Sequence, residues 1–87
     1  MIDLPPLRVF WDLEDDPGGN VQHISEHGVT PEEVEQVLGN VTLLDVSRSS
    51  GCAIAIGETQ AGRVLVVAFE KVDENALYPI TAYDLED

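Results

Sequence analysis

The segment from Thr30 to Asn40 limits most strongly how this chain can fold. Thr30 is typical of a helix N-cap, Pro31 suits the first helical position, and Glu33 completes a capping box. Gly39 and Asn40 are typical of a helix end. After Asn40 the apolar residues recur at every second position, which is the period of a strand. One helix is therefore expected to lead directly into a β-rich second half.

The second half of the chain predicts strands joined by tight turns. The run from Val64 to Phe69 is apolar on both faces and is expected at the centre of the sheet. Pro79 cannot donate to a strand ladder, so it places the last strand at a sheet edge or makes it bulge there. Sequential strands with short connections favour an antiparallel meander. The expected strands are Val41 to Val46, Cys52 to Gly57, Arg63 to Glu70 and Leu77 to Tyr83.

The first part of the chain predicts one strand and two short helices. Leu7 to Asp12 is expected to form the strand. Asn20 is expected to cap a helix from Val21 to His27, which Gly28 ends. The second helix is expected to turn an apolar stripe of Val34, Val37 and Leu38 towards the core. The predicted fold class is therefore α+β, in the order β-α-α-β-β-β-β, with both helices on one face of the meander.

Length and patterning indicate a single domain over residues 1–87, with an extended segment at 1–6 and a short acidic tail at 84–87. The N-terminus lacks a cationic start and an apolar stretch, so we expect no secretion signal. No run is long enough to cross a membrane. The single cysteine, Cys52, cannot form an internal disulfide. We therefore expect a cytoplasmic protein.

The charge balance is the main constraint on function. The chain has 17 acidic and four basic residues, for a formal net charge of −13. Proteins that bind phosphates use Lys and Arg to displace counterions, so unaided binding to nucleic acid or an anionic membrane is not expected. Two interpretations of the acidity stay open. It could be a solvated surface suited to a saline cytoplasm, or it could be a docking face for a basic partner.

One ordered set of residues extends over nearly the whole chain: Trp11-Asp12, Asn20, His27-Gly28-Val29-Thr30, Glu32-Glu33, Gly62-Arg63 and Val66-Val67. Together with the expected order of elements, this set resembles the BrnT-type toxins. The resemblance implies a RelE-like ribonuclease fold and a BrnA-type antitoxin as partner. It also implies that any enzymatic activity would be that of an endoribonuclease that needs neither metal nor cofactor.

The chain departs from that family where the family is basic. Glu14-Asp15-Asp16 follows Trp11-Asp12, and Ser25-Glu26 precedes the His-Gly pair. In the last strand, Tyr78 and Tyr83 replace both arginines of the Arg-rich segment of the family. We therefore expect a member that has lost RNA cleavage and acts through protein–protein contacts. Its partner would be a BrnA-like antitoxin, another basic protein, or a second copy that binds through the edge of the last strand.

Two other functions stay open. An active ribonuclease toxin would need a proton-transfer group and a cation at the phosphate. The residues available for these roles are His27, Arg63, Tyr83 and Tyr78, although an ion pair with a carboxylate is the structural interpretation of Arg63. His23 and His27 lie four residues apart on a helix and could bind a metal or a small ligand, but no HExxH pattern supports this.

Overall fold

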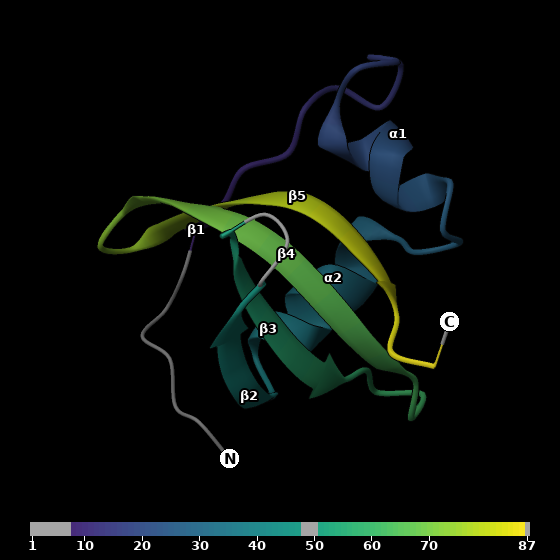
Figure 1. Ribbon diagram of the computed structural model, residues 1–87. Coiled ribbons are helices and arrows are strands. Elements are labelled where there is room, and N and C mark those ends of the chain that lie inside the picture. Colours follow the sequence, from purple (N-terminus) through teal and green to yellow (C-terminus); the bar gives the residue numbers. More distant parts are fainter. Residues whose placement is uncertain (1–7, 48–50, 87) are drawn as a thin grey trace.

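The computed structural model describes residues 8–47 and 51–86, which form an α+β domain with one sheet and two short helices (Figure 1). The elements are β1 (Arg8–Val9), α1 (Asn20–Ser25), α2 (Pro31–Leu38), β2 (Val41–Val46), β3 (Ala53–Glu58), β4 (Val64–Asp73) and β5 (Ala76–Asp84). The expected order of elements is therefore found in these ranges. The extended segment expected at 1–6 and the middle of the turn expected at 47–51 lie outside the described residues.

The sheet has the strand order β1-β5-β4-β3-β2, so β4 is central as the sequence predicts. β2 pairs antiparallel with β3, β3 with β4, and β4 with β5, and these four strands form the expected meander. The first strand, which the sequence does not place within the sheet, pairs parallel to β5 and makes the sheet mixed. The first strand is also much shorter than predicted. Only Arg8 and Val9 pair, opposite Ala76 and Leu77, and the chain then leaves the sheet at Phe10.

The helix α2 begins as its sequence predicts. Thr30 Oγ1 accepts a hydrogen bond from the Glu33 backbone N–H at 3.2 Å, and the Thr30 N–H donates to Glu33 Oε1 at 3.0 Å. This reciprocal pair satisfies two donors that a helix start would otherwise leave open. Gly39 is the C-cap, so the helix also ends where expected. The predicted stripe of Val34, Val37 and Leu38 is buried.

The start of α1 differs from the prediction. Gly19 is the N-cap and makes no side-chain capping bond, whereas Asn20 is the first helical residue. The Asn20 side chain instead bonds to the chain around Phe10 and to β5, as described below. Gly28 does follow the helix with a positive φ of 71°. The turn at Gly28 therefore allows α2 to begin at Pro31, two residues after Val29, without strain.

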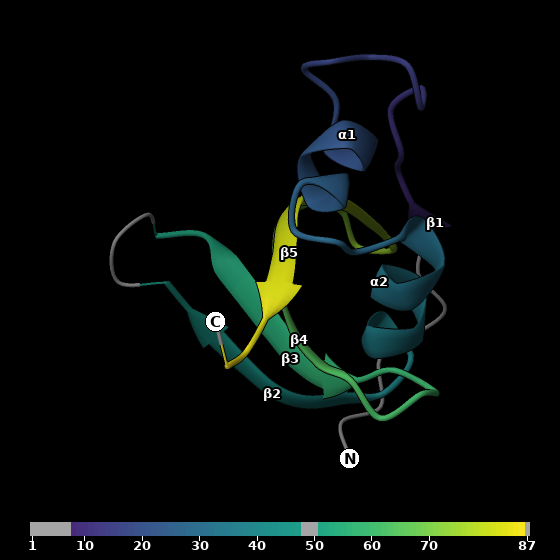
Figure 2. The same cartoon turned by 90° about the vertical axis from the view of Figure 1, so that its right-hand side faces the viewer.

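One hydrophobic cluster joins both helices to one face of the sheet. α2 contacts β3 and β4, whereas α1 lies against β5, beside the end of the sheet (Figure 2). Gly57 permits the close approach of β3 and α2, because a Cβ there would come within 2.6 Å of the Asn40 carbonyl oxygen. The sheet residues of this cluster include Val41, Ala55, Leu65, Val67 and Ala82, all fully buried.

Pro79 makes the last strand bulge, which is one of the two alternatives that its missing N–H allows. Phe69 pairs with Pro79 and Ala68 with Thr81, so Ile80 is the extra residue. On the other side of β5, Asn20 Nδ2 donates to the Pro79 carbonyl oxygen at 2.9 Å. The outer side of β5 is thus occupied first by β1 and then by Asn20. No helix in the described ranges is long and apolar enough to cross a membrane.

Candidate functional site

Arg63 is held at the end of the β3–β4 turn. Its backbone N–H donates to Thr59 Oγ1 at 3.1 Å, and its carbonyl accepts from the Thr59 N–H at 2.8 Å. Gly62 before it has a positive φ of 87°, a conformation that favours glycine. This turn directs the Arg63 side chain across the ends of β4 and β5 towards the segment that connects the two helices.

Every N–H group of the Arg63 guanidinium has an acceptor. Nε and Nη2 donate to the two carboxylate oxygens of Asp84 at 2.6 and 2.7 Å. Nη1 donates to Glu33 at 3.1 Å and to the Gly28 carbonyl at 2.9 Å. The second Nη2 proton points to the His27 carbonyl at 3.5 Å. The structural interpretation of Arg63 is thus confirmed, and its donors are directed to the protein itself.

The electrostatics agree with this geometry. The bidentate hydrogen bonds to Asp84 are the main reason that the pKa of Arg63 is raised above its ordinary value, and Glu33 adds to the effect. In return the Arg63 guanidinium lowers the pKa of the Asp84 carboxyl. Both groups are partly exposed, since the side chains of Arg63 and Asp84 retain 28% and 31% of their accessible surface. The pair therefore connects the β3–β4 turn to the end of β5 at the protein surface.

His27, Tyr83 and Arg63 lie together, as the candidate catalytic set requires. The rings of His27 and Tyr83 are 6.1 Å apart between centroids, and Arg63 reaches the His27 backbone. The ring of His23 also lies near that of His27, with 6.0 Å between the two ring centroids. Within the described residues, no group of three His, Cys, Asp or Glu side chains is placed to hold a metal ion. A metal at His23 and His27 would therefore need a ligand from elsewhere.

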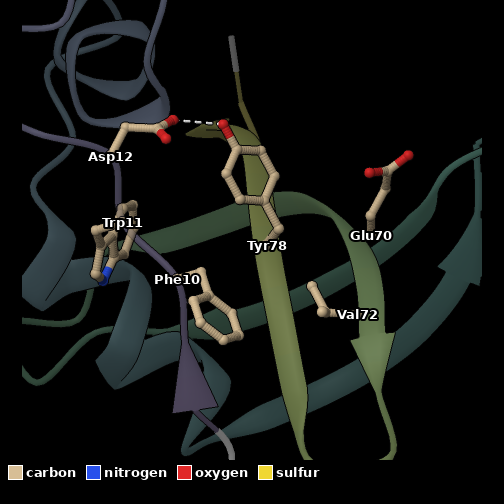
Figure 3. Close-up of a pocket in the computed structure, with 6 residues that line it drawn as sticks. All are labelled: Phe10, Trp11, Asp12, Glu70, Val72 and Tyr78. Carbon is tan, nitrogen blue, oxygen red and sulfur yellow. Dashed lines mark hydrogen bonds between the residues drawn. The ribbon is translucent and has the colours of Figure 1, made fainter.

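Tyr78 is separated from this set. Its hydroxyl donates to Asp12 Oδ2 at 2.5 Å (Figure 3). This bond, together with desolvation, raises the pKa of Tyr78 to about 12. It also lowers the pKa of Asp12, with help from the Asn20 N–H. Tyr78 thus belongs to a different cluster from His27, and the sequence expectation that placed it beside His27 as a catalytic residue gains no support from the geometry.

Asp12 and Asn20 tie the acidic loop to β5. The Asp12 N–H donates to Asn20 Oδ1 and the Asn20 N–H to Asp12 Oδ2, each at 2.9 Å. Asn20 Nδ2 also donates to the Phe10 and Pro79 carbonyl oxygens. A Cβ at Gly19 would lie 2.6 Å from the Asp12 Cβ, which explains a glycine beside this pair. The loop between them, with Glu14, Asp15 and Asp16, is exposed.

One concave feature of the described residues is an open pocket of about 500 Å³ between β5, β4 and the segment after β1. Figure 3 shows Tyr78 between Phe10 and Trp11 on one side and Glu70 and Val72 on the other. Trp11 Nε1 donates to Glu35 on α2 at 3.0 Å, which fixes the indole at the pocket wall. The lining is aromatic and acidic, and it consists of Phe10, Trp11, Asp12, Glu70, Val72 and Tyr78.

No protein-family model, no curated protein and no solved structure matches this chain. The likeness to BrnT-type toxins accordingly rests on the ordered set of residues in the sequence. What the structure adds is the class of protein, a small α+β domain with a mixed sheet and an acidic surface.

Sequence reasoning missed several residues of both clusters. Asp84 was expected in an acidic tail, but it is the last residue of β5 and the main partner of Arg63. Glu33, which the sequence places in the capping box and in the ordered set of residues, also pairs with Arg63. Phe10 and Glu70 lie in separate predicted strands, and only the pairing of β4 with β5 brings Glu70 opposite Tyr78. The alternation of apolar and polar residues in those strands predicts which face of the sheet each residue is on. It does not predict the pocket.

Proposed function

We propose that this chain is a binding domain for a basic protein and has no RNA-cleaving function. The observation that carries the proposal is the fully engaged guanidinium of Arg63, whose N–H groups all point to acceptors of the protein. A phosphate could use this cation only after displacing the hydrogen bonds to Asp84 or Glu33. The cation that RNA cleavage would require is therefore already neutralised.

The distribution of charge supports a basic partner. The acidic loop at Glu14-Asp15-Asp16 is exposed and follows closely after the pocket residue Asp12 in the chain. Complementary charge accelerates the encounter of two proteins and favours the correct partner. The same field repels polyanions, which lowers the local concentration of RNA at this surface. A cationic protein therefore fits the surface better than a nucleic acid does.

The proposed partner follows from the resemblance to BrnT-type toxins. In that reading the chain is a degenerate toxin-family protein that keeps the antitoxin contact, and the partner is a BrnA-like antitoxin or another basic protein. A second copy of this acidic chain would be a different partner, whose contact is the homodimer alternative to a basic protein. It would have to use β5 beyond Pro79, since β1 pairs with β5 at Ala76 and Leu77. The molar mass in solution, measured by light scattering, tests that contact separately.

One observation favours the ribonuclease alternative, namely the proximity of His27, Tyr83 and Arg63. His27 is exposed and could transfer a proton to or from a bound substrate. Its test compares growth after induced expression of the wild type and of His27→Ala. The binding proposal predicts that neither chain arrests growth and that neither degrades purified RNA at low salt. Growth arrest by the wild type alone would overturn the proposal in favour of a toxin.

A further inference from the structure

The aromatic and acidic pocket has the composition of a site for an organic cation. Phe10, Trp11 and Tyr78 bring three aromatic rings to one cavity, and Asp12 and Glu70 bring two carboxylates. Aromatic faces attract cations through their quadrupole, and neighbouring carboxylates add a direct charge interaction. The pocket is also open, with Phe10 39% and Val72 56% exposed. Exposed apolar surface beside carboxylates suits a ligand with a long apolar stem and a cationic head.

The carboxylates of the pocket keep free accepting capacity. Both hydrogen bonds to Asp12, from Tyr78 and from the Asn20 N–H, end on Oδ2. Among the described residues none donates to Asp12 Oδ1, and none donates to the side chain of Glu70. Asp12 and Glu70 lie on either side of Tyr78 (Figure 3). A planar cation with several N–H groups could therefore bond to one carboxylate while its face rests on a ring.

Phe10 already interacts with a guanidinium. The Cζ of Arg8 lies 5.5 Å from the centre of the Phe10 ring, although Arg8 is not one of the residues that line the pocket. Arginine is also the cation that best combines stacking on aromatic rings with directed bonds to carboxylates, whereas lysine presents a compact point charge. The net charge of −13 opposes a second copy as the occupant, and the carboxylates oppose an RNA phosphate.

We propose that this pocket binds an arginine side chain of the basic partner, with the guanidinium beside Asp12 and Glu70 and the apolar stem on Phe10 and Val72. This inference rests on the proposed function, because it names the group by which the partner is anchored. Binding hot spots are enriched in arginine, tryptophan and tyrosine, which matches an arginine placed against aromatic residues. The remaining acidic surface then contributes mainly to the rate of encounter.

The test uses Trp11, which is the only tryptophan of the chain and a residue of the pocket wall. Tryptophan emission is followed while the wild-type protein is titrated with a capped Gly-Arg-Gly peptide. A matched peptide carries citrulline, which has the shape of arginine without its charge. We expect a saturable change with arginine, with a dissociation constant of roughly 1 mM for one small anchor. The citrulline peptide is expected to bind at least about fivefold more weakly.

Two matched variants locate the binding. Glu70→Gln removes one carboxylate of the pocket, whereas Glu74→Gln removes an exposed carboxylate from the β4–β5 turn. Glu70→Gln is expected to weaken arginine binding about 2- to 5-fold, and Glu74→Gln to leave it unchanged. Phe10→Leu, which keeps an apolar contact and removes the ring, is expected to weaken it as well. Equal binding of the two peptides, an equal loss in both glutamine variants, or no saturable change would each overturn the proposal.

Failure of this inference is distinguishable from failure of the proposed function. Capture of a basic partner that is as strong with Glu70→Gln as with the wild type would refute the pocket and leave the binding function intact. The peptide titration, by contrast, needs no partner at all. Binding of the arginine peptide in a chain that captures no basic protein would therefore refute the proposed function and the role of the pocket as a partner anchor.

Discussion

The guanidinium of Arg63 and the carboxylate of Asp84 form a bidentate pair, with Nε–Oδ1 and Nη2–Oδ2 distances of 2.6 and 2.7 Å. The same guanidinium bonds to Glu33 at the start of α2 and to the Gly28 carbonyl, so one side chain connects the end of β5 to α2 and to the segment between the two helices. Arg63 therefore connects parts of the fold that lie far apart in the sequence.

Replacing Arg63 should destabilise the domain. We expect Arg63→Ala to lower the free energy of unfolding by about 1–3 kcal/mol, because the substitution leaves neighbouring carboxylates and a carbonyl without their donor. Arg63→Lys keeps the charge but loses the bidentate geometry, so an intermediate loss is expected. Urea unfolding followed by circular dichroism measures both. Lys71→Ala at an exposed position is the control, with a change below about 0.5 kcal/mol.

The Arg63–Asp84 pair also has a pH dependence of known sign. Arg63 lowers the pKa of Asp84 below its ordinary value of 3.8, so the folded state favours the charged carboxylate. The resulting stabilisation is present above pH 3.8 and is lost as the pH falls through the lowered pKa. Arg63→Ala should therefore flatten this part of the acid unfolding profile. An Arg63→Ala variant as stable as Lys71→Ala would contradict the structural role.

Tyr78 should ionise at unusually high pH. Its hydrogen bond to Asp12 raises its pKa to about 12 from 10.0, so the protonated hydroxyl stabilises the folded state fully below pH 10. That contribution is lost as the pH rises from 10.0 to about 12. In Tyr83→Phe, Tyr78 is the only tyrosine left, and ultraviolet absorbance of tyrosinate gives its midpoint directly. Adding Asp12→Asn should lower the midpoint, and a midpoint of 10.0 without that substitution would refute the bond.

Two glycines near the end of α2 should respond in opposite ways to alanine. At Gly57 a Cβ would meet the Asn40 carbonyl oxygen at 2.6 Å, and this backbone atom cannot move easily. Gly57→Ala should therefore cost about 1–3 kcal/mol of stability. At Gly39 the nearest atoms are 3.5 Å away and the backbone is helical, so Gly39→Ala should be neutral or stabilise by up to about 1 kcal/mol. Thermal melting compares the two, and equal effects would argue against the close contact of β3 with α2.

The parts of the fold that local chemistry determines could be predicted from the sequence. Thr30 and Glu33 cap α2 as expected, and Pro79 coincides with a bulge, because both effects act within a few residues. The parallel pairing of β1 could not be predicted, since it joins Arg8 and Val9 to residues far along the chain. The role of Asn20 was assigned wrongly because a capping residue and a residue that bonds across the fold look alike in one sequence.

The candidate site was predictable to a similar extent. The sequence identified His27, Arg63 and Tyr83, which do lie together. The resemblance to a known family supplied His27 and Arg63, whereas Tyr83 stands where that family has an arginine. It did not identify the pairing of Arg63 with Asp84 or the separation of Tyr78 from His27. Both depend on the register of β4 with β5, which is shifted at two irregularities, one between Ala68 and Phe69 and one between Lys71 and Asp73.

The central claim is that the acidic surface binds a basic protein, and quantitative affinity capture from the native host tests it most directly. The wild type, His27→Ala and a variant with Glu14, Asp15 and Asp16 all changed to Lys would be compared by mass spectrometry. We predict that the wild type and His27→Ala capture the same basic protein, and that the lysine variant and high salt release it. The account would be contradicted if the wild type captured no basic protein. It would also be contradicted if the lysine variant captured the same basic protein as well as the wild type does.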